Sequence, residues 1–474
     1  MEKAPGPIDL DGRTHEGGGQ LLRNAVCLAA LTGRPIMVHH IRGNRSGGGG
    51  LKAQHLACVN WLAEACGAAI EGAEKGSKTL IFEPQDPSGA PNAVSKAFKL
   101  VTRDGEAVYE TRLDIGTSGA TGLALQAILP YILFSPSRPT DHPVRLTLTG
   151  GTNVSGSPSF EYIDNVLVPT LYAIGLPDIR ATLKKRGWSQ GGSTIGEITF
   201  DIPARPYSSL PAFKKAPKDP NTKTYGPLHL EATFVGPASV HDYVRQVLPP
   251  AISHHFSEHI DETQGTLHIK CEGSLHEKRI YLIILAMMPD EGYNPGNTYQ
   301  LACDWLYDRK ITSIERAATE MVERVANSLA QLVDGGASAD EHLCDQLVIF
   351  QALAKGTSRV YPGVDEADDP REPSLHQRTA EWVAKKILGA KFDGDNACEG
   401  IGFGAEADDK KLKEAQSKER HEDVKTEADE EEREDNALAL RLKAFGINGP
   451  DRTGHGGSTM PCSSCNTDDT TSRT

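Results

Sequence analysis

The chain has 474 residues, a hydrophobic content of 38% and a formal net charge of −14 at pH 7. This length exceeds one ordinary domain and the apolar content suffices for a sizeable core, so we expect two globular parts and a tail. No run of about 18 apolar residues exists, and the start MEKAPGPIDL has no apolar signal-peptide core, which argues against membrane insertion and secretion. Nine scattered cysteines suit reduced thiols in an intracellular protein.

The acidic balance at first argues against a nucleic-acid ligand, because phosphate binding usually leaves a basic footprint. Residues 391–474, however, hold 12 Lys and Arg against 20 Asp and Glu, so over half of the excess negative charge lies in this C-terminal segment. Residues 1–60 hold seven Lys and Arg against four acidic residues. The start of the chain is therefore locally basic and compatible with a phosphate ligand.

The first predicted helix follows a run of glycines. Residues 16–23 read EGGGQLLR, and apolar side chains recur at helical spacing from Leu21 to Ala29 until Gly33 ends the pattern. Glycines let backbone N–H groups approach an anion, and the first helical turn near Gln20 adds unpaired donors and a partial positive charge. The Lys and Ser/Thr of a P-loop are absent, so the motif indicates a rarer kind of phosphate site.

Helices and strands then alternate along the chain. A strand at 35–41, a helix at 54–66 ended by Gly67 and a strand at 78–84 follow the first helix. The same rhythm returns as a helix, a strand, a helix and a strand at 121–134, 144–151, 161–176 and 196–202. This pattern predicts an α/β protein built from repeated units whose helices pack on one face of a sheet.

A smaller α/β domain is predicted at residues 208–330, inserted into a core made of residues 7–207 and 331–392. Its pattern gives strands at 228–234, 267–272 and 279–287, and helices at 239–256 and 315–333, the first interrupted by Pro249 and Pro250. Residues 393–474 are predicted to form an acidic, mostly disordered tail. Its CSSC motif is a lone CxxC without a second ligand pair, which argues against zinc.

Several segments together resemble the RNA 3′-terminal phosphate cyclase family. They are LDGRTHEGGGQLLRNAVCLAALTGRP, IRGNR and QHL near the start, then GTSGATGLALQAILP, GGTNVSGSP, HLCDQL and SLHQRTAEWVAKKIL at residues 116–130, 150–158, 342–347 and 374–388. Their order and approximate spacing match the family over most of residues 7–392, more weakly between 205 and 330. The resemblance implies β-α-β-α-β-β repeats with a smaller domain inserted into the last.

His376 is the residue to which the resemblance assigns catalysis, because the family histidine at this place attacks the α-phosphate of ATP and becomes adenylylated. Ser374 is a plausible N-cap for the helix that follows. The positive end of that helix disfavours imidazolium and leaves a nitrogen lone pair free for nucleophilic attack. The alternative is a surface histidine beside a loop.

The resemblance also implies the ATP site. It assigns nucleotide contacts to seven residues: Gln126, Pro158, His342, Leu343, Cys344, Asp345 and Gln346. His342 occupies the place where the family often carries a tyrosine beside the adenine, and an imidazole can also stack. The ordinary alternatives are an exposed helical carboxylate for Asp345, a hydrogen-bonded core amide for Gln126 and a turn proline for Pro158.

Charged and polar residues near the glycines complete the predicted site. Glu16 is the candidate ligand of Mg²⁺ or Mn²⁺, since a hard ion prefers carboxylate oxygen and bridges nucleotide phosphates. The RNA end and its phosphate are assigned to Gln20, Arg23, Arg42, Arg45, Gln54 and His55. Guanidinium groups match phosphate oxygens bidentately. Each arginine alone is more often solvated, and His55 is equally compatible with a core position.

The predicted function is the ATP-dependent conversion of an RNA 3′-terminal phosphate to a 2′,3′-cyclic phosphodiester. The rival is a non-catalytic branch of the same family, a ribosome-biogenesis scaffold that lacks the nucleophile; His376 favours the enzyme. A third hypothesis makes the acidic tail the basis of an interaction protein. The expected partners are ATP, a divalent ion and RNA with a 3′-phosphate, with no membrane. A homodimer and a protein partner for the tail stay open, and the nucleoplasm is preferred to the cytoplasm.

Overall fold

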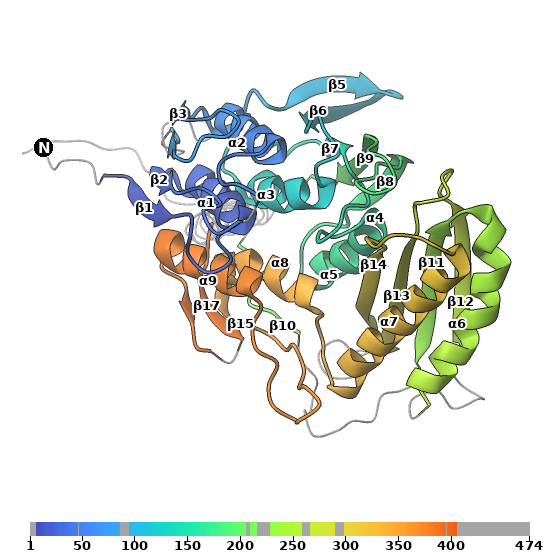
Figure 1. The fold of residues 1–474 in the computed structure, drawn as a ribbon. Helices are drawn as coiled ribbons and strands as arrows, with labels where there is room; N and C mark the ends of the chain where they lie inside the picture. The colour runs from blue at the N-terminus through green and yellow to red at the C-terminus, as the bar shows by residue number, and fades with distance from the viewer. Residues whose placement is uncertain are drawn as a thin grey trace, which may run out of the picture. The chain divides into compact units, whose positions relative to one another are not determined.

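The computed structural model describes residues 6–45, 47–85, 94–204, 209–215, 228–257, 266–289, 298–394 and 396–404. Most of the predicted tail, with its CSSC motif, lies outside the described residues. Helices and strands alternate through the described part in several mixed sheets (Figure 1). The predicted α/β class is confirmed.

The first repeat has the topology β-α-β-α-β-β. Its elements are β1 (Ile8–Asp11), α1 (Gly19–Thr32), β2 (Ile36–His39), α2 (Ala53–Cys66), β3 (Ala69–Glu71) and β4 (Leu80–Glu83). The strand order is β1-β2-β4-β3, with β1 parallel to β2 and the other pairs antiparallel. Helices α1 and α2 both end at a glycine in the left-handed region, Gly33 and Gly67, which avoids a Cβ penalty there.

The second repeat copies this topology from β6 onward. Its elements are β5 (Lys99–Arg103), β6 (Glu106–Asp114), α3 (Thr121–Phe134), β7 (Val144–Gly150), α4 (Phe160–Tyr162), a π-helical segment (Ile163–Leu167), α5 (Val168–Ala173), β8 (Arg180–Lys185) and β9 (Gly196–Ile202). The strand order is β5-β6-β7-β9-β8, in which β6 and β7 are parallel. The strand β5 extends the sheet by pairing antiparallel with β6.

The third repeat is split by the inserted domain. Its elements are β10 (Lys214–Lys215), α8 (Glu341–Leu353), β15 (Lys355–Val360), α9 (Leu375–Leu388), β16 (Lys391–Phe392) and β17 (Ala397–Ile401). The order β10-β15-β17-β16 again joins a parallel pair to antiparallel neighbours.

The third repeat differs from the predicted boundaries at both ends. The strand β10 belongs to the core sheet although it lies inside the range 208–330, and β17 lies inside the range predicted as tail. Ala397 and Cys398 of β17 are buried against the core, which holds the strand in the fold. A strand of five residues between acidic neighbours has too short an apolar pattern to stand out in the sequence.

The inserted domain has its own hydrophobic core. It contains β11 (His229–Gly236), a short 3₁₀ turn (Ala238–Val240), α6 (His241–His255), β12 (Thr266–Gly273), β13 (Tyr281–Pro289), β14 (Thr298–Leu306) and α7 (Ile314–Asp334). Its sheet has the order β12-β11-β13-β14. The predicted interruption of α6 at Pro249 and Pro250 is wrong, because the helix is continuous through both prolines. Buried Val244, Leu248 and Ile252 anchor it despite two missing N–H donors.

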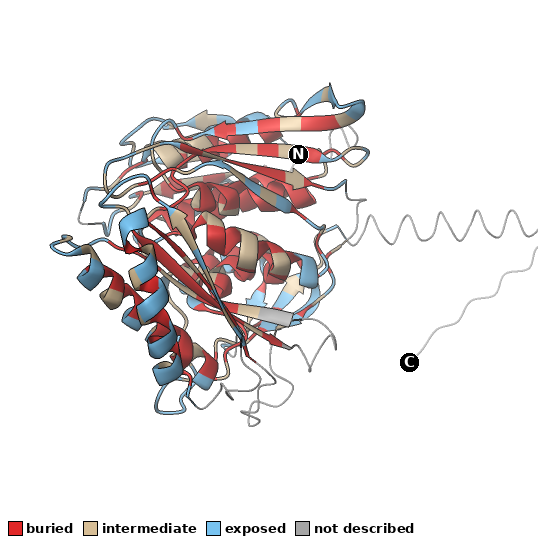
Figure 2. Cartoon of the chain, turned by 90° about the vertical axis from the view of Figure 1, so that its right-hand side faces the viewer, coloured by how far each residue is buried: buried red, intermediate tan, exposed pale blue. Residues whose placement is uncertain are grey.

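Helices of the three repeats pack on one another and place their first turns close together. The helix α1 contacts α2, α3 and α9, and α8 contacts α9 and α3. Every residue of α1 from Gly19 to Leu31 is buried, and Figure 2 shows the helices of the core largely in the colour of buried residues. Within the described ranges, no helix combines the length and apolar character that crossing a membrane requires.

Candidate active site

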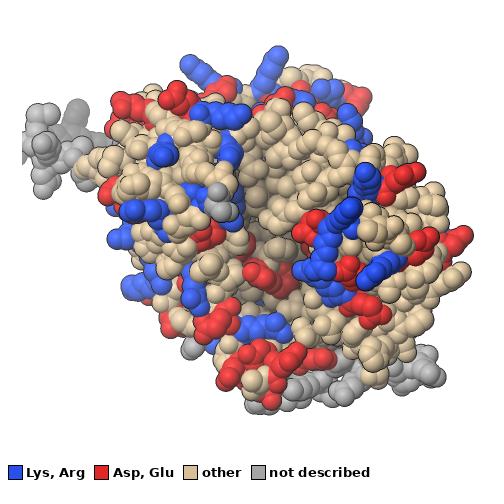
Figure 3. Space-filling view, viewed as in Figure 1, with Lys and Arg blue, Asp and Glu red and all other residues tan. Residues whose placement is uncertain are grey.

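A cavity of about 530 Å³ opens where the first turns of the core helices meet. Figure 3 shows a hollow in this face of the molecule with basic and acidic side chains around it. The lining residues are Glu16, Gly19, Gln20, Arg23, Arg42, Arg45, Lys52, Gln54, His55, Gly122, Leu123, Gln126, Ser155, Gly156, Pro158, Glu341, His342, Asp345, Gln346 and His376.

Within the described part of the chain, five helices begin at this cavity. Gln20, His55, Leu123, His342 and His376 belong to the first turns of α1, α2, α3, α8 and α9, and all five line it. Neither α1 nor α3 has a side-chain N-cap, and the first turns of α1, α2 and α3 contain no acidic residue. Helix N-termini carry partial positive charge and unpaired N–H groups, so this arrangement favours anions.

The glycine loop needs its glycines for close packing. Gly17 has a φ of +58°, which side chains rarely adopt, and a Cβ on Gly19 would lie 2.5 Å from Nε2 of His55. The backbone N–H of Gly18 donates to Oε2 of Glu16 at 2.8 Å, and Arg45 forms an ion pair with the same carboxylate. The loop therefore fixes Glu16 at the edge of the cavity.

A chain of hydrogen bonds crosses the cavity floor from α1 to α8. Arg23 donates through Nη2 to Oε1 of Gln20 at 2.6 Å and through Nε to Oε1 of Gln126 at 3.2 Å. Gln126 in turn donates through Nε2 to Oδ1 of Asp345 at 3.4 Å. Burial lowers the pKa of Arg23, and the carboxylate of Glu16 opposes this effect. Buried arginines of this kind are held rigidly, which suits bidentate binding of phosphate.

His55 is a neutral hydrogen-bond donor facing the cavity. The backbone N–H of Lys52 donates to Nδ1 of His55 at 3.2 Å, so the proton of the neutral ring is on Nε2. Burial lowers the pKa of His55 to about 3, and the charges of Arg23, Arg42 and Lys52 reinforce this shift. The ring therefore stays neutral at physiological pH.

His376 lies in the first turn of α9 and lines the cavity. The predicted N-cap Ser374 is present, because its Oγ accepts a hydrogen bond from the backbone N–H of Gln377 at 3.0 Å. Burial lowers the pKa of His376; Glu16 opposes this shift, whereas Arg23 and Arg45 add to it. The neutral imidazole that nucleophilic attack requires is thus the favoured form.

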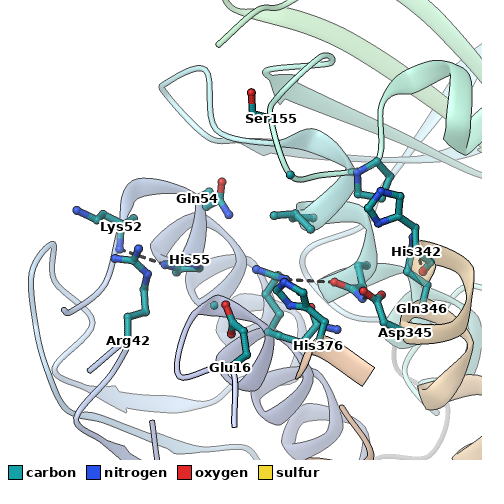
Figure 4. Close-up of a pocket in the computed structure, with 18 of the residues that line it drawn as sticks. Glu16, Arg42, Lys52, Gln54, His55, Ser155, His342, Asp345, Gln346 and His376 are labelled. Atoms are coloured by element: carbon teal, nitrogen blue, oxygen red, sulfur yellow. Dashed lines mark hydrogen bonds between the residues drawn. The ribbon is translucent and has the colours of Figure 1, made fainter. Parts of the chain in front are cut away.

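The helix α8 supplies the wall opposite Arg42, Lys52 and His55, with Glu16 and His376 between the two sides (Figure 4). Burial raises the pKa of Asp345 to about 7, and the nearby His342 opposes this shift. Burial works against a charged His342, but Asp304, Asp340 and Asp345 outweigh it and raise the pKa of this imidazole.

One ring contact and one hydrogen bond orient the side chains of His342 and Gln346 on α8. The imidazole of His342 meets the ring of Tyr162 edge to face, with 5.6 Å between centroids. Gln346 donates through Nε2 to the backbone carbonyl of His342 at 3.2 Å. The side chains of His342 and Gln346 are thereby held at fixed positions along α8, facing the cavity.

Comparison with known proteins places the chain in a family. A family described as RNA 3′-terminal phosphate cyclase matches residues 14–393. The chain belongs to the RNA 3′-terminal phosphate cyclase family. A protein of Methanosarcina mazei named RNA 3′-terminal phosphate cyclase is 29% identical over 388 residues, covering 81% of this chain and 96% of that protein. One of Pyrobaculum neutrophilum with the same name is 29% identical over 410 residues, covering 84% and 99%.

The cavity of this cyclase-family chain collects nearly all of the residues predicted from sequence. Thirteen of the fifteen line it: Glu16, Gln20, Arg23, Arg42, Arg45, Gln54, His55, Gln126, Pro158, His342, Asp345, Gln346 and His376. They come from the glycine loop, the loop after β2, the segment before α4, and helices α1, α2, α3, α8 and α9. Their roles in binding and catalysis stay predictions.

Leu343 and Cys344 do not line the cavity, contrary to the prediction. Leu343 is fully buried in the hydrophobic core, and Cys344 is buried with its Sγ facing the backbone carbonyl of Ala339 at 3.8 Å. Positions i, i+3 and i+4 share one helix face, which is the spacing of His342, Asp345 and Gln346. The two residues between them therefore point elsewhere.

Seven lining residues of this family member were not among the predicted site residues: Gly19, Lys52, Gly122, Leu123, Ser155, Gly156 and Glu341. Lys52 had a readable signal, since a lysine two residues after the last of four glycines and just before the predicted helix at 54–66 stands where a phosphate would bind. Ser155 and Gly156 lie within GGTNVSGSP, but a turn of small residues gives no sign of which members face a cavity.

Proposed function

We propose that the protein is an ATP-dependent RNA 3′-terminal phosphate cyclase that works through a covalent histidine–AMP intermediate. The observation that carries this proposal is the position of His376, a neutral imidazole in the cavity where five helix N-termini and several basic residues meet. A nucleophile surrounded by anion-binding groups is suited to attack on a phosphate ester. Family membership supports the same reaction.

The proposed reaction has three displacements at phosphorus. A nitrogen of His376 attacks the α-phosphorus of ATP, and the bond to pyrophosphate breaks. A 3′-phosphate oxygen of the RNA then takes AMP from the histidine, which regains its lone pair. The adjacent 2′-oxygen finally attacks the 3′-phosphorus, loses its proton and releases AMP, leaving a 2′,3′-cyclic phosphodiester. This last step needs a 2′-OH, so the cyclised product is RNA.

The cavity offers separate surfaces for the base and for the phosphates. In this proposal the adenine lies at the wall formed by Pro158, His342 and Gln346, and the polyphosphate lies toward Arg23, Arg42 and Arg45. His55 points an N–H donor into the cavity on the side of the arginines. In phosphoryl transfer, positioning and electrostatic stabilisation supply most of the catalysis, and these residues provide both.

Glu16 is suited to be the one protein carboxylate that binds Mg²⁺ or Mn²⁺. Its side chain is only 5% exposed and lines the cavity, and among the described residues its oxygens contact the Gly18 N–H and the half-exposed end of Arg45. A magnesium ion typically takes one or two carboxylates together with substrate phosphates and water. Glu16 would hold such an ion, which would neutralise charge on the phosphates, and Arg45 would then be available to a phosphate oxygen.

The proposal is tested by incubating purified protein with ATP labelled at the α-phosphorus, with Mg²⁺ or Mn²⁺ present. We expect acid-labile label on the wild-type chain, none on His376→Ala, and wild-type labelling on His254→Ala, which removes a histidine of α6 in the inserted domain. Label should then move to RNA that ends in a 3′-phosphate. Equal labelling of His376→Ala would refute the nucleophile, and a folded wild-type protein that binds no ATP would favour the scaffold.

The same proposal takes RNA with a 3′-phosphate end as the substrate. A nuclear location, a homodimer and a protein partner for the acidic tail remain predictions from the sequence.

Deleting residues 405–474 tests whether the tail is needed for the reaction, because none of the lining residues lies in that range. Loss of covalent labelling in this truncated chain would contradict a dispensable tail.

A further inference from the structure

Two histidines and an aspartate meet at the ends of β1 and β2, outside the cavity. The parallel register pairs Asp11, the last residue of β1, with His39, the last residue of β2, and His40 follows directly. One oxygen or nitrogen from each of these three side chains lies within 4.8 Å of the other two. None of the three lines the proposed nucleotide cavity, so this cluster has no part in the reaction described above.

His39 is oriented as a metal ligand would be. Its Nδ1 lies 3.0 Å from Oδ1 of Asp9, which accepts the N–H and leaves the lone pair on Nε2. That Nε2 faces Oδ2 of Asp11 at 3.8 Å. Histidines that bind metals commonly donate their other ring N–H to a carboxylate, which fixes the tautomer and the ring orientation.

His40 supplies a second nitrogen from an unusual backbone conformation. Its Nδ1 lies 3.4 Å from Oδ1 of Asp11, and its ring meets that of His39 edge to face at 4.7 Å. Its φ is +50°, a value that few residues other than glycine adopt. Ligand bonds of about 2.0–2.2 Å in tetrahedral geometry place neighbouring donor atoms roughly 3.4 Å apart. Nδ1 of His40 lies 3.4 Å from Oδ1 of Asp11 and Nε2 of His39 lies 3.8 Å from its Oδ2, which is near that value for both histidines.

We propose that Asp11, His39 and His40 form a site for a zinc-type divalent ion, distinct from the ion at Glu16. Two imidazoles and one carboxylate are a donor set that suits zinc and its late first-row neighbours, whereas magnesium prefers oxygen ligands alone. Water completes the coordination of an ion at this surface position. Asp9 is the residue that holds His39 in place.

Arg13 is the competitor for this site. Its Nε and Nη2 donate to both oxygens of Asp11, at 3.0 Å and 2.7 Å, so the carboxylate is ion-paired when no metal is bound. The Arg13 side chain is 53% exposed, and exposed ion pairs contribute little to stability. A zinc ion therefore displaces the guanidinium at small cost. Loss of Arg13 should therefore strengthen zinc binding, whereas loss of either histidine should weaken it.

The site would fasten two loops that also reach the cavity. His40 lies two residues before Arg42, and the loop after Asp11 leads to Glu16. The same two loops are joined by Asn44, whose Nδ2 donates to the backbone carbonyl of Arg13 at 2.6 Å. Bound zinc adds a second link between them.

The test is calorimetric titration of Zn²⁺ into the full-length chain carrying Cys462→Ser and Cys465→Ser, which removes the tail thiols as rival ligands. We expect His39→Ala and His40→Ala each to lower the binding stoichiometry by one zinc ion per chain. Asp9→Ala should weaken that zinc about 10- to 100-fold, as loss of a group that orients a ligand does. Arg13→Ala should tighten it, because the competing cation is gone.

Two controls separate binding from damage to the fold. His142→Ala removes another surface imidazole and should leave the titration unchanged. Thermal unfolding without zinc should be the same for the parent and for the two histidine variants, since both rings are at least partly exposed. Unchanged zinc stoichiometry and affinity in His39→Ala and His40→Ala, or a parent that binds no zinc, would overturn the site.

Discussion

The backbone N–H of Glu16 donates to Oγ1 of Thr379 at 3.2 Å, which joins the glycine loop to α9 one turn after His376. The hydroxyl of Thr379 itself donates to the backbone carbonyl of Leu375 at 2.7 Å, and the residue is fully buried. Residues from opposite ends of the folded chain are thus fixed relative to each other by one hydroxyl. The proposed metal ligand and the proposed nucleophile both depend on it.

Replacing Thr379 by valine should therefore impair covalent labelling, although Thr379 does not line the cavity. The variant Thr379→Val keeps the shape but leaves the N–H of Glu16 unpaired, which costs about 1–3 kcal/mol for a buried group. We expect a lower urea midpoint and at least a tenfold slower covalent labelling from ATP, roughly as small misplacements of reacting groups do. Thr379→Ser retains the hydroxyl and should stay near wild type; equal loss in both variants would contradict this account.

A methyl group at Gly19 should disturb two neighbours at once. The Cβ of Gly19→Ala would lie 2.5 Å from Nε2 of His55 and 2.8 Å from Nη1 of Arg23, both of which are buried and hydrogen-bonded. We expect ATP affinity to fall by about tenfold or more, equivalent to about 1.4 kcal/mol. The matched control is Gly273→Ala, where an added Cβ meets no atom within 4 Å. Unchanged ATP binding by Gly19→Ala would show that the two side chains move aside freely.

Long periodic elements were predictable, and short ones were not. The helix ending at Gly33 and the one ending at Gly67 appear where the apolar spacing and the terminal glycine indicated. The strands β10 and β17 were missed, because two and five residues give too short a pattern for a period of two. Their structure comes from pairing with β15, a contact between distant parts of the chain.

Site residues were predictable where they lie within a motif of known chemistry. They were less predictable where only tertiary structure determines which way a side chain points or which residues meet. His376 and Arg23 lie within motifs that resemble the family, and both line the cavity. Leu343 was included because it stands in the same motif, yet the helix turns it into the core. The link between Glu16 and Thr379 joins two segments that no local pattern relates, so only the structure reveals it.

Asp345 should make the protein less stable as the pH rises. Burial raises its pKa from 3.8 to about 7, so the folded chain holds a proton that the unfolded chain releases between these values. Stability is therefore lost as the pH rises through this window. Asp345→Asn should raise the unfolding temperature at pH 8 but not at pH 4. The matching difference in the free energy of unfolding is on the order of 4 kcal/mol. An equal effect at both pH values would contradict the shift, and Asp141→Asn, on the surface, is the control.

Arg186 should be a main link between the core and the inserted domain. It lies 2.5 Å from Oε1 of Glu161 in α4 and 2.5 Å from Oε2 of Glu272 in β12. The side chain of Glu161 is only 6% exposed, so removing its partner leaves a buried charge, which typically costs about 3–5 kcal/mol. We expect Arg186→Met to lower the urea midpoint strongly, and the added change Glu161→Gln to restore part of it by removing the charge. A double variant as unstable as Arg186→Met would show that packing, rather than the unpaired carboxylate, causes the loss.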